Sequence, residues 1–343
     1  MQINKKELQE ALDIVKPGLA SKEMIAQSTS FAFMNGCVVT YNDEISISHP
    51  IKDLELQGAI EAQHLYPFLS KIKSDTLNAE IVGNEIILKS GKSKAGLTLQ
   101  SEIKLPLQSI FEEKTWYPLP DDFAKLVSFT TSSASHDMSK PILTCVHVHE
   151  SGFVEASDSV RITKGTFGTE MPVETFLLPA TSADVMVKLS PKEIAKGDSW
   201  VHFRTEEGTT LSCRIYNRDN FPNTEHLFVL KGVDLKLPKA SKAMLEKAMI
   251  FAKREHSSQE VINLELSEGV MVMKSRSESG WFEEPTPIRY QGKEIDFSIS
   301  PHLLKEILNE SLACTLAKDR IKFEGANWVY IAMLRYKKKK ETK

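Results

Sequence analysis

The chain has 343 residues, of which 41% are hydrophobic and 26% are charged, and its formal net charge is −3. This length exceeds one ordinary hydrophobic core and predicts two or three domains. The net charge argues against a general nucleic-acid coat protein, which is usually basic overall. The sequence also contains no run of the ~18 apolar residues that a membrane span requires.

The N-terminus and the cysteines predict a cytoplasmic protein. Residues 1–6 lead directly into an amphipathic segment and lack the apolar core of a secretory signal. The scattered cysteines form no Cys-x-x-Cys pair, which favours buried, reduced thiols over disulfides or zinc ligands. They are Cys37, Cys145, Cys213 and Cys314.

Six short segments have the apolar spacing of amphipathic helices. They lie near residues 5–16, 62–73, 119–130, 180–189, 240–254 and 301–310. Alternate segments start roughly 115–120 residues apart, and the stretches between them have the alternating pattern of β-strands. This threefold recurrence of a two-helix, β-rich unit predicts a quasi-symmetric α+β protein. We expect domains at residues 1–112, 113–232 and 233–343.

Turn residues indicate where hairpins and linkers lie between the expected helices. Hairpins are expected at 86–99, with Gly91 at the turn, and at 200–215, with Gly208 at the turn. The stretches 104–118 and 231–239 resemble linkers. A last strand is expected at 327–335, before the Lys337–Lys340 tail.

Motifs of catalytic and phosphate-binding sites are absent from the sequence, which predicts that the protein is not an enzyme and needs no cofactor. His147 and His149 could place two imidazoles on one strand face, as in a metal site. They lack a third ligand at a suitable spacing, so an ordinary exposed strand face is the better interpretation, and no metal is expected. Asp121 and Asp122 follow Pro120 and are expected to stabilise a helix N-terminus.

Positive charge is modestly concentrated on the expected helices. The segment 239–254 carries five basic residues against the single acidic Glu246, and the segment 62–73 adds two lysines. The basic residues are Lys239, Lys242, Lys247, Lys253 and Arg254 in the first segment, and Lys71 and Lys73 in the second.

Four short sequences occur in an order that is typical of one protein family. They are residues 140–144 (KPILT), 156–162 (ASDSVRI), 220–223 (NFPN) and 332–336 (AMLRY). Together they resemble the RPILNG-like run, the TDGHRL-like turn, the RFPDY-like segment and the MPMRL-like terminal strand of the bacterial DNA polymerase III beta subunits, the sliding clamps. Residues 90–94 (SGKSK) resemble that family's SGRSR hairpin. The resemblance extends from the first expected helix to Tyr336.

The sequence also departs from the clamp motifs. Ser159 and Val160 replace a Gly-His pair, Thr144 and Cys145 replace Asn-Gly, and Met333 replaces a proline. These departures indicate a divergent member, for which encoding by a phage or mobile element is a hypothesis.

Resemblance to the clamps implies a function. Two three-domain chains of that family close head to tail into a ring around duplex DNA, and helices line the hole. The resemblance therefore predicts half of a closed ring, a homodimer and a processivity factor in DNA replication, in a bacterial cell or infected host. Such a ring needs only weak, sequence-independent phosphate contacts. The residues expected to face DNA are Lys22, Lys71, Lys73, Lys242, Lys247, Lys253 and Arg254, although each could equally be a solvated surface residue.

The resemblance also implies an apolar pocket that binds linear peptides of a DNA polymerase, a clamp loader and other partners. Part of this set, namely Leu143, Ile162 and Leu227, could instead be interdomain core. The pocket residues would be Leu143, Ser157, Ser159, Val160, Arg161, Ile162, Pro222, His226, Leu227, Tyr330, Ala332, Met333, Leu334, Arg335 and Tyr336.

Ring closure in the family pairs the first domain of one chain with the third domain of the other. Ala95 and Leu97 on one side, and Ile250 and Phe251 on the other, are expected to form this seam, with core packing as the alternative interpretation. A different function remains open at this stage: a clamp-fold scaffold or decoy that binds clamp-interacting peptides without encircling DNA.

Overall fold

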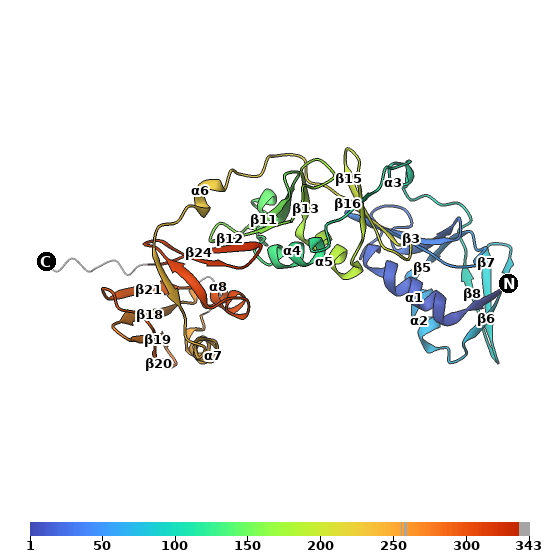
Figure 1. Ribbon diagram of the computed structural model, residues 1–343. Coiled ribbons are helices and arrows are strands. Elements are labelled where there is room, and N and C mark those ends of the chain that lie inside the picture. Colours follow the sequence, from blue (N-terminus) through green and yellow to red (C-terminus); the bar gives the residue numbers. More distant parts are fainter. Residues whose placement is uncertain (255, 257–258, 336–343) are drawn as a thin grey trace. The chain divides into compact units, whose positions relative to one another are not determined.

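Figure 1 shows the computed structural model of the chain, which describes residues 1–254, 256 and 259–335. These residues divide into two compact units. Unit 1 comprises Met1–Ser128, His147–Gly152 and Gly168–Asp219, and unit 2 comprises Phe129–Val146, Phe153–Phe167 and the described residues from Asn220 onward. Tyr336 and the Lys337–Lys340 tail lie outside the described residues.

Unit 1 contains two antiparallel sheets made of strands from its described residues. The four-stranded sheet has the order β1-β6-β7-β8 and the eight-stranded sheet the order β5-β2-β3-β4-β16-β15-β14-β9. The strands of the first are β1 (Gln2–Asn4), β6 (Thr76–Val82), β7 (Glu85–Ser90) and β8 (Ser93–Thr98). Those of the second are β2 (Ser30–Met34), β3 (Cys37–Tyr41), β4 (Ile45–Pro50), β5 (Gly58–Glu61), β9 (Tyr117–Pro118), β14 (Glu193–Lys196), β15 (Trp200–Arg204) and β16 (Thr210–Arg214).

Helices of unit 1 bury the apolar stripes that the sequence predicts. Asn4 caps α1 because its side-chain oxygen accepts hydrogen bonds from the backbone N–H groups of Lys6 and Glu7, at 3.1 and 3.2 Å. Helix α1 lies beside α2 (Figure 1). The helical segments are α1 (Lys5–Val15), the 3-10 turn η1 (Lys16–Gly18), α2 (Ala62–Lys71), α3 (Gln108–Phe111) and α5 (Ala180–Leu189), which follows β13 (Phe176–Pro179).

Unit 2 has a corresponding arrangement of strands. One sheet has the order β20-β19-β18-β21, and another contains the run β11-β12-β24-β23-β22-β17. The first consists of β18 (Ile262–Ser267), β19 (Val270–Ser277), β20 (Gly280–Pro287) and β21 (Ile295–Ile299). The run consists of β11 (Phe153–Ser157), β12 (Arg161–Thr166), β17 (Val233–Lys236), β22 (Ala313–Leu316), β23 (Arg320–Glu324) and β24 (Trp328–Met333).

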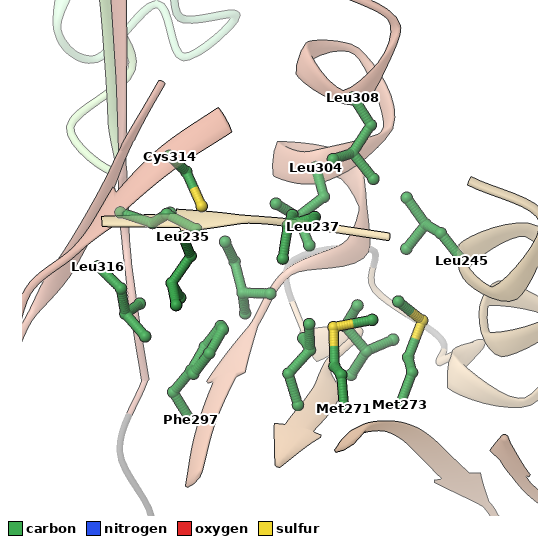
Figure 2. Packing of buried hydrophobic residues seen from close by; sticks show 14 of the residues in the cluster. Leu235, Leu237, Leu245, Met271, Met273, Phe297, Leu304, Leu308, Cys314 and Leu316 are labelled. Atoms are coloured by element: carbon green, nitrogen blue, oxygen red, sulfur yellow. The ribbon is translucent and has the colours of Figure 1, made fainter. Parts of the chain in front are cut away.

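Helices α7 and α8 cover the apolar face of unit 2. Figure 2 shows Leu245 of α7 and Leu304 of α8 turned toward Met271 and Met273 of β19, within one cluster of buried side chains. The helical segments here are η2 (Pro141–Thr144), α6 (Glu225–Phe228), α7 (Ser241–Ala252), α8 (Pro301–Lys305) and η4 (Ile307–Asn309). Two elements, α4 (Phe123–Thr131) and β10 (Cys145–His149), contain residues of both units. No helix in the described part of the chain has the length and apolar character needed to cross a membrane.

The predicted helical segments are confirmed, with shifts at their ends. Segment 180–189 coincides with α5, whereas segment 119–130 becomes helical only at Phe123. The turn before α4 is made by Pro120, whose carbonyl accepts a hydrogen bond from the Phe123 N–H at 3.0 Å. Segment 301–310 is α8 followed by η4. Both predicted hairpins are also confirmed, as β7–β8 and β15–β16.

The two predicted linkers were wrong in part. Residues 231–239 contain β17, which pairs with β22, and Leu235 and Leu237 are buried. Exposed lysines alternate with these leucines and make the segment look polar as a whole. Residues 104–118 contain α3 and β9, and Leu105, Leu107 and Ile110 belong to a core cluster of unit 1.

Within the core of unit 1, His202 is a buried titratable group. This β15 residue is 2% exposed, and its Nδ1 lies 2.8 Å from the hydroxyl of Ser212, its partner on β16. Burial, together with the charge of Lys114, lowers the pKa of His202 to about 3. The imidazole is therefore neutral in the folded protein across the physiological pH range.

We predict that acid destabilises unit 1 through His202. The folded protein binds fewer protons than the unfolded chain between pH 6.5 and about 3, so stability is present above pH 6.5 and is lost as the pH falls through this range. From pH 7 to 5 this group alone should lower the free energy of unfolding by about 2 kcal/mol. Urea unfolding across this range should give a shallower pH dependence for His202→Gln. Replacing the exposed His64 by Gln should leave the slope as in wild type, and equal slopes in all three proteins would contradict the assignment.

Candidate functional site

The principal candidate site is a cavity of about 130 Å³ in unit 2, above the pairing of β12 with β24. The register sets Ile162 opposite Ile331, so both side chains lie on one face of the sheet. Arg320 of β23 lies opposite Met333, two residues further along β24 on that same face. The lining residues are Ser157, Ser159, Val160, Arg161, Ile162, Leu227, Asp319, Arg320, Ile331 and Met333.

The cavity has an apolar floor and an accessible rim. Ile162 and Ile331 are buried, whereas Val160 is 44% and Met333 is 52% exposed. Its volume is similar to the ~150 Å³ apolar cavity that can hold a benzene molecule. The site is therefore large enough for one aliphatic or aromatic side chain that enters from solvent.

One wall of the cavity is the tight turn between β11 and β12. The Asp158 carboxylate accepts hydrogen bonds from the backbone N–H groups of Val160 and Arg161, at 3.0 and 2.9 Å. Ser159 has a φ of 78°, a left-handed conformation that is uncommon for a residue other than glycine. The clamp motif that this turn resembles has glycine at this position. Ser159 adopts the same left-handed backbone conformation, and its Cβ makes that conformation strained.

Arg161 is fixed by charge on two sides. Its Nε donates to Asp158 at 2.9 Å and its Nη1 donates to Glu306 at 2.9 Å, and its side chain is only 13% exposed. Tyr330 lies close by, and its hydroxyl donates to the Leu303 carbonyl at 2.7 Å. Burial raises the pKa of Tyr330. These contacts stiffen the strand pair beneath the cavity.

The opposite wall is Leu227 of α6, a short helix that is held at three points. The Thr224 hydroxyl donates to the buried Glu155 carboxylate at 2.6 Å. The Lys164 ammonium lies 5.5 Å from the centre of the Phe228 ring. The Leu227 carbonyl accepts a hydrogen bond from Arg320 at 3.3 Å. A four-residue helix cannot hold its own position, so these contacts set the width of the cavity.

Several predicted pocket residues do not line the cavity. Tyr330, Ala332 and Leu334 belong to the buried core of unit 2, because alternate residues of β24 face opposite sides of the sheet. Leu143 is half-buried, while Pro222 and His226 are exposed. Arg335 forms an isolated bridge with Ser298, and Tyr336 lies outside the described residues.

Sequence reasoning missed Asp319, Arg320 and Ile331. Ile331 could have been found, because it lies two residues before Met333 and so shares its strand face. Asp319 and Arg320 belong to a turn that carries none of the family-like motifs. Only the pairing of β23 with β24 brings them to the cavity.

The residues expected to face DNA are exposed in both units. Lys22 lies in the loop after η1, and Lys71 and Lys73 are at or just beyond the end of α2. On or after α7, Lys247 forms a 2.7 Å ion pair with Glu284, and Arg254 donates to the backbone carbonyls of Lys253 and Arg276. Lys242 and Lys253 form no side-chain hydrogen bond or ion pair with the described residues.

The residues expected at the dimer seam lie next to sheet edges. Ala95 and Leu97 are half-buried on β8, the last strand of its sheet. In unit 2, Ile250 at the end of α7 is 63% exposed, and Phe251 is half-buried. Trp281, which was not among the residues expected at the seam, is 64% exposed on the edge strand β20.

The described residues hold no group of three or more His, Cys, Asp or Glu side chains that could bind a metal ion. The rings of His147 and His149 lie 5.5 Å apart, and His149 Nδ1 lies 2.8 Å from the Ser151 hydroxyl. All four cysteines are free, and burial raises the pKa of Cys145 to about 11 and that of Cys314 to about 12. These two thiols are therefore protonated at neutral pH.

In comparisons of sequence, no protein-family model and no curated protein matches the chain. Comparison of structures gives matches over nearly its whole length. The DNA polymerase sliding clamp of Bacillus subtilis is 20% identical, with a TM-score of 0.84 over 98% of each chain. The beta chain of DNA polymerase III from Streptococcus pneumoniae is also 20% identical, with a TM-score of 0.84 over 98% of this chain and 99% of that one. The sliding clamp of Pseudomonas aeruginosa bound to griselimycin is 13% identical, with a TM-score of 0.86 over 98% and 99%.

The chain has the fold of the bacterial sliding clamps. This result confirms the α+β prediction and the family resemblance that the four short motifs gave. The low identity explains why comparisons of sequence fail. The clamp fold also runs through both units, since the alignments leave only 2% of the chain uncovered.

We predict that Thr224→Val loosens the α6 wall. The change keeps the shape of the side chain but removes a donor to the buried Glu155 carboxylate, at an expected cost of about 1.5–3 kcal/mol. Hydrogen–deuterium exchange of residues 222–230 should accelerate, and the apparent Tm should fall. Thr166→Val is the matched control, because Thr166 is exposed near the end of β12. Unchanged exchange in 222–230 would mean that other contacts position α6.

Proposed function

We propose that the protein is a DNA sliding clamp, a non-enzymatic processivity factor that encircles duplex DNA and tethers a polymerase and other partners. The observation that carries this proposal is the clamp fold over 98% of the chain, at TM-scores of 0.84 to clamps from two genera. The ordered family-like motifs and the cavity beside β24 support it independently. As the family resemblance implies, each chain would supply three domains, at residues 1–112, 113–232 and 233–343.

The ring requires a homodimer, for which the two edge strands β8 and β20 offer matching surfaces. Strand β8 carries Lys94, with Lys92 just before it, whereas β20 carries Glu283 and Glu284, which also form ion pairs with Lys274 and Lys247 at 3.6 and 2.7 Å. Ile250 and Trp281 add exposed apolar area on the β20 side. A second copy that placed its β8 beside β20 would cover this apolar area and bring opposite charges together.

Solution mass measured by light scattering tests the ring. We expect a mass near twice 38.5 kDa for the wild type. Ile250→Glu should weaken the dimer at least about tenfold, because it removes apolar burial and places a carboxylate beside acidic β20. Met138→Glu is the control, since Met138 is 74% exposed and lies outside the proposed seam. A strict monomer at micromolar concentration would instead favour a clamp-fold scaffold or decoy that binds peptides without encircling DNA.

Contacts with DNA would come from the exposed basic residues of α2, α7 and the loop after η1. These contacts need no base recognition, because phosphates present the same charge at every sequence. A ring also keeps the protein on DNA by topology, so individual contacts can be weak. Because the ring holds the DNA and the phosphate contacts only need to be weak, a chain with a net charge of −3 can serve as a DNA clamp.

A double substitution tests the DNA-facing assignment. Lys242→Glu with Lys253→Glu should weaken binding to a duplex of about 30 base pairs roughly tenfold at low salt. The slope of log affinity against log salt should become shallower by about two. Lys236→Glu with Lys293→Glu changes the net charge equally at exposed sites on β17 and in a loop. Equal losses in the two double variants would contradict the assignment, and both should keep the wild-type affinity for peptides.

Peptide docking would use the cavity of unit 2. Its apolar floor fits one large apolar side chain, and Met333 and Val160 at the rim can adjust to different partners. The family resemblance implies that the polymerase and the clamp loader both insert short linear motifs here. Partners would therefore compete for the same cavity.

A further inference from the structure

Arg320 is the polar exception in an otherwise apolar part of the cavity. It lies beside Met333 on the sheet face that carries Ile331, and its side chain is 26% exposed. Of the two arginines that line the cavity, Arg161 is held by the carboxylates of Asp158 and Glu306. Arg320 is the more exposed of the two, at 26% against 13%, so its guanidinium is the one that a molecule entering from solvent would contact.

A carboxylate already occupies one edge of the Arg320 guanidinium. Nε and Nη2 donate to the two oxygens of Asp319 at 3.2 and 3.1 Å, while Nη1 donates to the Leu227 carbonyl at 3.3 Å. The hydrogen bond from Arg320 lowers the pKa of Asp319, so this residue stays ionised at neutral pH. The guanidinium also has N–H donors that are not used within the described residues.

The Asp319–Arg320 pair is weakly held. The two residues are neighbours in a turn, their contacts are at the long end of the hydrogen-bond range, and Asp319 is 60% exposed. Exposed pairs of this kind contribute little to stability. A carboxylate delivered into the cavity by a bound peptide would be better shielded from water and could form a stronger bidentate contact.

We propose that Arg320 selects peptides in which an Asp or Glu side chain flanks the apolar residue that enters the cavity, and that Asp319 competes with this carboxylate. Asp319 shows the geometry directly, because it is a side-chain carboxylate bound to the Nε edge of Arg320. The inference rests on the proposed function, since it requires a peptide in the cavity. It adds that Arg320 recognises the acidic residue of the peptide and that Asp319 lowers the affinity of the protein for that peptide.

Binding of defined peptides tests the proposal. The probes are fluorescently labelled, C-terminally amidated peptides of the form Gly-Ser-Xaa-Leu-Leu-Yaa-Ser-Gly. Xaa is Asp and Yaa is Asn in the first peptide, Xaa is Asn and Yaa is Asp in the second, and both are Asn in the third. Anisotropy with the full-length protein should show about tenfold tighter binding for one Asp peptide than for the double-Asn peptide. This ratio should fall with added salt, because the contact is between charges.

Variants separate the two roles. Arg320→Gln should reduce the Asp/Asn ratio to about one. The ratio is the readout, because loss of the Arg320–Leu227 hydrogen bond would weaken the Asp and Asn peptides alike. Asp319→Asn should tighten binding of the Asp peptide about threefold, because the internal competitor loses its charge. Arg289→Gln is the matched control, since Arg289 is exposed just after β20 and outside the cavity. Each variant should keep the wild-type Tm within a few degrees.

The outcomes distinguish this inference from the proposed function. Met333→Asn should weaken all three peptides about tenfold, because it removes apolar area at the rim. If Met333→Asn weakens the peptides but the wild type does not discriminate Asp from Asn, the role of Arg320 is wrong and docking stands. If no peptide binds the wild type, both the docking function and the selectivity are contradicted.

Discussion

The pairing of β12 with β24 is the constraint on which the candidate site depends. It joins segments that are far apart in the sequence, so its formation must offset a large loss of chain entropy. Burial of Ile162, Ile331 and Tyr330 at the pairing supplies the opposing free energy. A slip of one residue would turn Tyr330 and Ala332 toward the cavity and Ile331 into the core. The register therefore determines the chemistry of the cavity floor.

A second long-range pairing shows that strand topology alone does not give a cavity an apolar floor. In unit 1, β4 pairs with β16 and sets Ser48 opposite Thr210 and Ser46 opposite Ser212. The cavity there, of about 360 Å³, has these four hydroxyl residues on its strand side. Arg204 and the 110–116 segment complete the lining, with Ile110, Phe111 and Trp116 beside three charged side chains. The pairing in unit 2 presents Ile162 and Ile331 instead. Of these two strand pairings, the one in unit 2 gives the more apolar floor, because hydroxyl groups keep their water.

The architecture could be predicted from the sequence because it rests on periodic features. Apolar spacing located the segments that became α1, α2, α5 and α7, and glycines located the hairpin turns. The pocket set that the family resemblance implied includes Tyr330 and Ala332, whereas side-chain alternation along β24 turns these two residues to the core, away from Ile331 and Met333. Arg320 could not be found in this way. Its place in the cavity depends on which strands are neighbours, and a single sequence carries no signal of that pairing.

The low sequence identity with the known clamps is consistent with the few demands that the fold makes on each position. A buried position such as Leu264 or Phe323 must be apolar and of suitable volume, and many residue combinations meet this condition. Under the proposed function, DNA is contacted without base recognition, so the basic residues could lie at different positions on the exposed helix faces and act in the same way. The position of Arg320 is constrained differently, since it reaches the Leu227 carbonyl from one strand position, and the proposed contact with a peptide would have to be made from the same place. Residues of the core pattern and the strand register must therefore meet limits of volume and spacing, whereas the exposed rim residues Val160 and Met333 are free of those limits.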